Sequence, residues 1–221
     1  MLDNCGSISN QLKLAFNCSK CLCIAFGPKF KQPLAPLFLN NVTVDWSCSL
    51  KYLGVTFIAG AQLLCNIDVV VRKFYAASNC IFNNSNSLDD LLQLSLQQSY
   101  CLPLLSYGLS GVRLSASQLR TLNICWNDVF RKIFHYNKWD SVKPVIEGLG
   151  LLDFTHLYYL SVASLVKSML KSNNLVLFNL AGIFCKSSEC EKFCLNCGFS
   201  ISSSLFVVKQ IIYARFRNLC L

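Results

Sequence analysis

The sequence predicts an α+β fold in which a small, antiparallel, strand-rich part precedes a mainly α-helical part. Apolar residues alternate with a period of two through much of the first 58 residues, and they recur at helical spacing from Ala61 onwards. Of the 221 residues, 53% are hydrophobic and only 14% are charged, which excludes intrinsic disorder and allows a packed core. We divide the chain into segments 1–58, 59–171 and 172–221.

The first segment is expected to combine a helix end with strands. Residues 8–16 are typical of the end of a helix, and three prolines between residues 28 and 36 interrupt any regular element after Gly27. Three stretches alternate as strands do, and the first of them has apolar residues on both faces: Lys20–Gly27, Val42–Trp46 and Lys51–Phe57.

The second segment is expected to hold four helices. The clearest has Ser115 and Gln118 at the spacing of a capping box, in which each side chain accepts a hydrogen bond from the backbone of the other residue. Its apolar stripe runs from Leu119 to Phe134. The helical patterns cover these ranges: 61–75, 88–100, 115–134 and 155–171. After Ser172 the pattern is weak.

The charge balance and the cysteines bear on partners and compartment. Twenty basic residues against 11 acidic ones favour a polyanionic partner. The 14 cysteines follow no signal peptide, so we expect an intracellular protein, cytoplasmic or nuclear and not secreted. The uncharged stretch from Leu91 to Val112 contains glutamines and Pro103, which favours a buried helix and a turn over a membrane span; we expect no membrane partner.

One group of cysteines is denser than the rest and leaves a metal site open. Four thiolates at such spacing are able to close a tetrahedral zinc site, although the loops between them are shorter than in a typical finger. The other interpretation is a cysteine-rich tail without metal. The four residues are Cys185, Cys190, Cys194 and Cys197.

Several sequence pieces, in order along residues 1–165, resemble the reverse transcriptases of non-LTR, LINE-type (jockey-like) retrotransposons. The family pattern "l.FN..Ks…i.FG" corresponds to Leu14–Gly27, and its primer-grip pattern "KYLGV" corresponds to Lys51–Val55. Its thumb patterns "sYclP.LLYG" and "L..L…WN..fRkiF" correspond to Ser99–Gly108 and Leu119–Phe134. The resemblance implies the end of a palm followed by a helical thumb of an RNA-directed DNA polymerase.

The same resemblance implies that the catalytic metal site is missing. The family holds two Mg²⁺ ions with three aspartates, a pair of them in a "[FY]ADD" hairpin upstream of the first helix. We expect those aspartates to precede Met1, so that this chain binds no cofactor by itself and is inactive alone. Asp89 and Asp90 follow the primer-grip segment instead, and they suit the first turn of a helix.

The resemblance also nominates individual residues. It suggests Lys20 as a general acid; the plain alternative is a solvated lysine at the start of a strand. Tyr52, Leu53 and Gly54 match the primer grip; they also suit a buried hairpin, and the two interpretations are compatible.

The polar face of the third helix is the remaining candidate interface with nucleic acid. It carries Arg120, Asn127, Arg131 and Lys132, which suit phosphate contacts but also suit an ordinary solvated face. His135 and His156 are expected to be structural or surface residues. Further basic candidates are Arg72, Lys73, Lys138 and Lys143.

The sequence therefore predicts a fragment of a retrotransposon reverse transcriptase that retains binding to an RNA–DNA or DNA primer–template. An upstream fragment of the enzyme is a candidate protein partner, and whether the two pair is left open by the sequence. The alternative is a noncatalytic helical interaction module whose cysteine-rich tail binds zinc or a protein.

Overall fold

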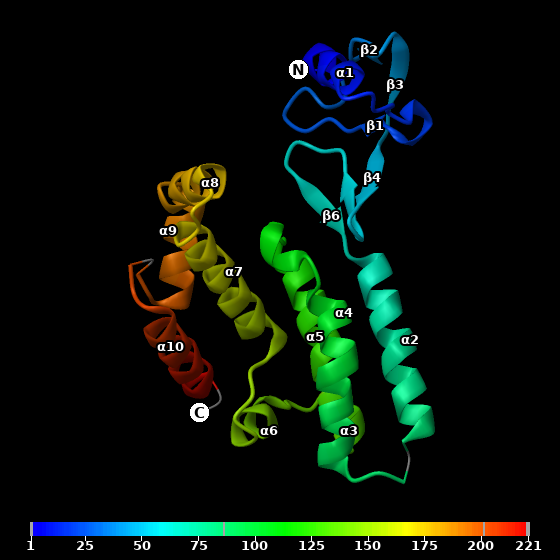
Figure 1. Ribbon diagram of the computed structural model, residues 1–221. Helices are drawn as coiled ribbons and strands as arrows, with labels where there is room; N and C mark the ends of the chain where they lie inside the picture. The colour runs from blue at the N-terminus through cyan, green and yellow to red at the C-terminus, as the bar shows by residue number, and fades with distance from the viewer. Residues whose placement is uncertain (1, 86, 201, 220–221) are drawn as a thin grey trace. The chain divides into compact units, whose positions relative to one another are not determined.

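The computed structural model describes residues 2–85, 87–200 and 202–219, and it has the α+β architecture expected from the sequence. The chain divides into two compact units, one ending at Ile67 and one beginning at Asp68. The first unit holds the strands and the second is helical in the residues that the structure describes (Figure 1). Each unit is described by itself.

The strand-rich unit begins with helix α1 (Leu2–Gln11), which ends before Lys13, a residue with a left-handed φ of 54°. Helix α1 packs against strand β2 (Leu37–Leu39). After a short 3-10 turn, η1 (Cys18–Lys20), the first sheet has the order β1-β3-β2: β1 (Leu22–Cys23) runs parallel to β3 (Val42–Trp46), and β2 runs antiparallel to it.

The second sheet of this unit is antiparallel throughout. Strands β4 (Ser49–Tyr52), β5 (Val55–Ile58) and β6 (Leu64–Asn66) pair in the order β4-β5-β6. A two-residue loop, Leu53-Gly54, joins β4 to β5, with φ values of 46° and 85°. Positive φ at both loop residues is the requirement of a type I′ hairpin.

The helical unit begins with α2 (Asp68–Asn84), followed by a helical stretch over 90–106. In that stretch, α3 (Asp90–Leu96) passes through a π turn, η2 (Gln97–Cys101), into α4 (Leu102–Ser106). The π turn lies just before Pro103, which has no N–H to donate to the preceding turn. Across the whole stretch 90–106, the buried residues are Leu94, Gln97, Cys101 and Leu105.

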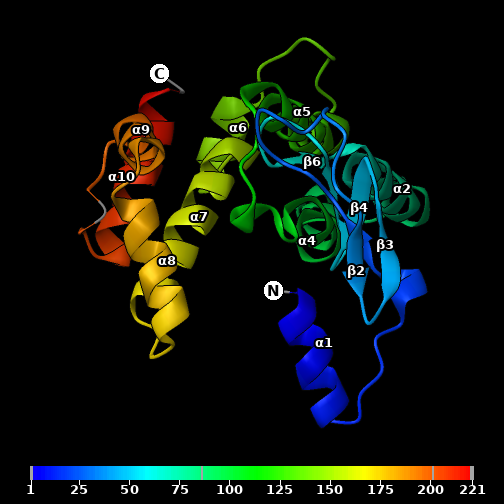
Figure 2. The ribbon, with the colours of Figure 1, turned by 90° about the horizontal axis from the view of Figure 1, so that it is seen from above.

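Helix α5 (Ala116–Ile133) is the central helix of this unit and contacts α2, α3 and α7. It follows the 3-10 turn η3 (Leu109–Gly111) and begins at the capping box that the sequence predicts. Trp126 and Phe130 are fully buried and meet edge to face, with ring centroids 5.3 Å apart. Helices α2, α4 and α5 lie side by side in both views (Figures 1 and 2).

Five further helices follow α5 in the part of the chain that the structure describes. They are α6 (Lys143–Gly148), α7 (Phe154–Leu170), α8 (Leu175–Cys185), α9 (Ser188–Cys197) and α10 (Leu205–Asn218). Helices α8 and α10 both contact α7, and α10 buries Val208, Ile212 and Phe216. The weakly patterned tail is therefore helical.

Four of the expected elements differ from the sequence predictions. The first helix ends at Gln11 instead of Phe16, and the long helix expected from Ala61 begins at Asp68, because Leu64–Asn66 pairs with β5 as a strand. In the Lys20–Gly27 stretch only Leu22–Cys23 forms a strand, with a single further bridge from Phe26 to Gly60, and Leu22 is 44% exposed, so the expected two-sided burial is wrong. The strand expected over Lys51–Phe57 is divided into β4 and β5, because Leu53 and Gly54 form a turn.

Candidate nucleic-acid interface

The tip of the β4–β5 hairpin exposes large side chains. Tyr52 is 62% exposed and Leu53 is 70% exposed, and Gly54 and Lys51 are exposed beside them. A core role for Tyr52 and Leu53, one of the two sequence interpretations, is therefore wrong. Leu53 also holds a left-handed φ, which costs a non-glycine residue about 1 kcal/mol.

Lys20 lies at the end of η1, just before β1, and its side chain is exposed. The acidic residues of the strand-rich unit are Asp3, in α1, and Asp45, in β3. Two carboxylates are one fewer than the family resemblance requires for its metal pair. The residues of this unit do not fit that metal site.

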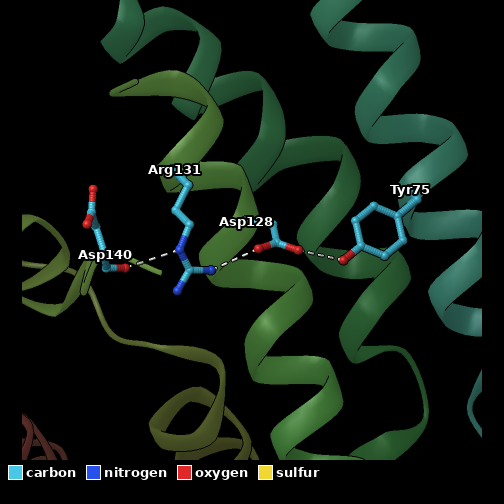
Figure 3. Close-up of polar contacts among 4 residues, drawn as sticks. All are labelled: Tyr75, Asp128, Arg131 and Asp140. Atoms are coloured by element: carbon cyan, nitrogen blue, oxygen red, sulfur yellow. Dashed lines mark hydrogen bonds and ion pairs between the residues drawn. The ribbon is translucent and has the colours of Figure 1, made fainter. Parts of the chain in front are cut away.

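Arg131 joins three parts of the helical unit, as Figure 3 shows. Its Nη1 donates to Asp128 Oδ1 at 2.8 Å, and its Nε donates to the carbonyl of Asp140 at 3.2 Å. Asp128 Oδ2 accepts from the hydroxyl of Tyr75, on α2, at 2.8 Å. Burial and the Asp128 carboxylate raise the pKa of Tyr75 well above its usual value. Arg131 is thus a link between α5, the loop after it and, through Asp128, α2.

The other three residues nominated on α5 have different surroundings. Lys132 Nζ donates to Asn79 Oδ1 at 3.1 Å and lies 4.2 Å from the ring centroid of Phe82, both on α2. Asn127 is half-buried, and its buried Oδ1 has no hydrogen-bond partner among the described residues. Arg120 is exposed. The four side chains do not form one open basic face.

The further basic candidates are scattered. Lys73 is exposed, whereas Arg72 donates to the carbonyl of Asp68 at 3.4 Å, on its own helix. Lys138 lies 5.0 Å from the ring centroid of Trp139, and Lys143 is half-buried at the start of α6. These positions supply positive charge but no common surface.

The carboxyl pair Asp89-Asp90 lies at the start of a helix, α3, as its sequence position predicts. Asp89 is the N-cap residue, and its carboxylate accepts a hydrogen bond from the N–H of Leu91 at 3.0 Å. Asp90 occupies the first turn, where a negative charge suits the helix dipole.

The cysteines of the tail line up along α9. Cys190 Sγ and Cys194 Sγ lie 4.0 Å apart, and burial raises the pKa of the Cys190 and Cys197 thiols to about 12. Cys185 lies at the end of α8. Within the described ranges, all four are free thiols, and no set of three or more His, Cys, Asp or Glu side chains is placed to hold a metal ion.

Sequence reasoning missed a buried pair at the start of α7. The Asp153 carboxylate caps the helix by accepting from the N–H of His156 at 3.0 Å, and His156 Nδ1 lies 2.5 Å from the same oxygen. The imidazole also packs on Phe216 of α10, with ring centroids 5.1 Å apart. The Asp-x-x-His spacing before an apolar run is the local signal of this cap. It is structural, as expected for His156.

His135 ends α5. Its φ of 55° is left-handed, and the following residue, Tyr136, donates its N–H to the carbonyl of Arg131 at 2.9 Å, as in a Schellman motif. Glycine is the usual residue at that position.

No protein-family model, curated protein sequence or solved structure matches this chain. In the part of the chain that the structure describes, no helix is long and apolar enough to cross a membrane.

Proposed function

We propose that this chain is a noncatalytic fragment of a retrotransposon-type RNA-directed DNA polymerase whose remaining activity is binding of a primer–template duplex inside the cell. The observation that carries the proposal is the β4–β5 tip: a leucine held in a left-handed conformation and an adjacent tyrosine are both exposed. Neither exposure nor strain stabilises the fold, and such strain is common at functional sites.

The chemistry of the tip suits a nucleic-acid strand. An exposed tyrosine ring is able to stack on a base or sugar, and Gly54 lets the backbone approach closely. Lys51, beside Tyr52, supplies a positive charge for a phosphate. The sequence order of the family-like segments supports the same function.

Fluorescence anisotropy with a labelled RNA–DNA duplex at low salt tests the proposal. Tyr52→Ala removes one stacking ring and is expected to weaken binding about tenfold. Leu53→Asn relieves the turn strain, because asparagine tolerates the left-handed region, and it removes the apolar tip. It is expected to raise stability by about 0.5–1 kcal/mol while lowering affinity. Phe38→Ala, at a half-exposed aromatic of β2, is the matched control.

The salt dependence of binding gives an independent readout. Because Arg131 and Lys132 are held in internal contacts, replacing both should leave the slope of log K against log salt unchanged, whereas Lys51→Ala at the hairpin should reduce that slope by about 1. Absence of affinity at low salt, or affinity that Tyr52→Ala leaves unchanged, contradicts the binding role. Magnesium-dependent primer extension by this chain contradicts the noncatalytic assignment.

The second candidate is a noncatalytic interaction module whose cysteine-rich tail binds zinc or a protein. The Cys190 and Cys194 thiols lie 4.0 Å apart, and a zinc site would need Cys185 and Cys197 to move towards them. Stoichiometric zinc in the purified protein, lost in Cys190→Ser, would favour it. An upstream open sequence that encodes a "[FY]ADD" hairpin would favour the polymerase fragment and supply its partner.

A further inference from the structure

Helix α8 presents an uncharged apolar surface outward from the helical unit. Ala181 faces the interior, whereas a stripe at i, i+4 and i+7 on the opposite side is exposed: Val176 by 64%, Leu180 by 50% and Ile183 by 68%. Leu175, at the start of the helix, is 71% exposed. In both views α8 lies at the edge of this unit, beside α7 (Figures 1 and 2).

A lysine side chain flanks the apolar stripe at each end. Lys171 precedes the N-cap of α8 and Lys186 follows its last residue; both side chains are exposed. The chain from residue 154 onwards has seven basic residues and two acidic ones. A short apolar helix between lysines is the arrangement in which long basic side chains reach the headgroup layer while apolar side chains enter the acyl boundary.

A polar groove lies next to the N-terminal end of α8. It measures about 860 Å³ and is lined by six serines, two leucines and two lysines, Lys167 and Lys171. Its walls are the C-terminal half of α7 and the residues before α10, and Lys167 donates to the carbonyl of Ser203 within it. Hydroxyls and ammonium groups are the donors that phosphate oxygens accept from.

We propose that α8 docks on the surface of an anionic phospholipid bilayer, with the stripe in the acyl boundary and the lysines and groove among the phosphates. A second copy is disfavoured, because α8 has a lysine at either end and any antiparallel or parallel pairing brings like charges together. A nucleic acid is disfavoured, because the stripe offers no donor to phosphates or bases. Surface docking differs from the sequence expectation of no membrane partner, which considered only a spanning helix.

Co-sedimentation of the full chain with lipid vesicles tests whether α8 docks on an anionic bilayer. Binding is expected to vesicles of phosphatidylcholine with about one third phosphatidylserine, and to be much weaker with phosphatidylcholine alone. Val176→Ser plus Ile183→Ser is expected to weaken partitioning at least about tenfold. Lys171→Gln plus Lys186→Gln is expected to weaken it about 30-fold on anionic vesicles only. Leu91→Ser, at a 57% exposed leucine of α3, is the matched control and should bind like the unaltered chain.

Other occupants give different results. Dimerisation that the stripe variant abolishes, without vesicle binding, overturns the proposal in favour of a second copy. Equal binding to neutral and anionic vesicles overturns the role of the lysines. Binding of inorganic phosphate or RNA–DNA duplex that the lysine variant abolishes, again without vesicle binding, assigns the groove to a soluble anion or to nucleic acid. Circular dichroism of each variant confirms that it is folded.

Discussion

Replacing Arg131 by alanine separates a structural role from a phosphate-binding one. The guanidinium is 19% exposed and Asp128 is 39% exposed, so their ion pair is partly screened and contributes about 0.5–1 kcal/mol. The hydrogen bond to the Asp140 carbonyl adds about 1 kcal/mol, and the buried aliphatic stem adds about 1 kcal/mol. The free energy of unfolding should therefore fall by about 3 kcal/mol in Arg131→Ala.

Urea unfolding followed by tryptophan fluorescence measures this change from the shift of the midpoint. Arg120→Ala is the matched control on the same helix, because Arg120 is exposed, and it should change stability by less than about 0.5 kcal/mol. A double-mutant cycle with Asp128→Asn, which keeps an acceptor for Tyr75, should give a coupling of about 0.5–1 kcal/mol.

The reasoning is refuted if Arg131→Ala and Arg120→Ala cost the same stability while Arg131→Ala weakens duplex binding more. That result would mean that the guanidinium leaves Asp128 in solution and contacts a phosphate.

Three further measurements test local features of the fold. His135→Gly should raise stability by about 0.5–1 kcal/mol, because glycine adopts the left-handed φ without strain; a loss would mean that the imidazole makes a stabilising contact. Ser115→Ala removes the acceptor for the Gln118 N–H and should cost about 1 kcal/mol, with an unchanged urea midpoint contradicting the cap. Burial raises the pKa of Cys101 to about 11 and of Cys197 to about 12 from 9.0, so above pH 9 the folded state binds more protons than the unfolded state. Stability should be complete below pH 9 and decline as pH rises towards 12, less steeply in Cys101→Ala plus Cys197→Ala.

Local signals were enough to predict the best-defined elements. The capping box of Ser115 and Gln118 depends only on residues three apart. The hairpin at Lys51–Val55 is implied by the family resemblance, whereas the local alternation over Lys51–Phe57 predicts a single strand. The start of α2 could not be predicted, because Leu63 and Leu64 fit a helical or a strand period. The choice depends on pairing of β6 with β5, which lies outside the local window.

In the candidate site too, some features follow from local sequence and others depend on contacts between distant residues. A helical wheel places Arg131 and Lys132 among the polar residues of α5, but it contains no information about Asp140 or about Asn79 on another helix. Those partners come from tertiary packing. Conversely, the exposure of Tyr52 and Leu53 follows from their place in and beside the two-residue hairpin turn, which adjacent residues define.

Leu53 and the exposed stripe of α8 differ in backbone strain, and this difference bears on function. Leu53 is exposed at a strained turn, where asparagine would be more stable, so the fold does not account for its presence. The exposed stripe of α8 is unstrained; it only lacks a covering surface. A strained residue is best explained by a specific contact that depends on its shape, whereas an unstrained apolar stripe needs only an apolar medium. The proposed nucleic-acid strand at the hairpin and the proposed lipid surface at α8 would meet these separate requirements, and variants at one site should leave binding at the other intact.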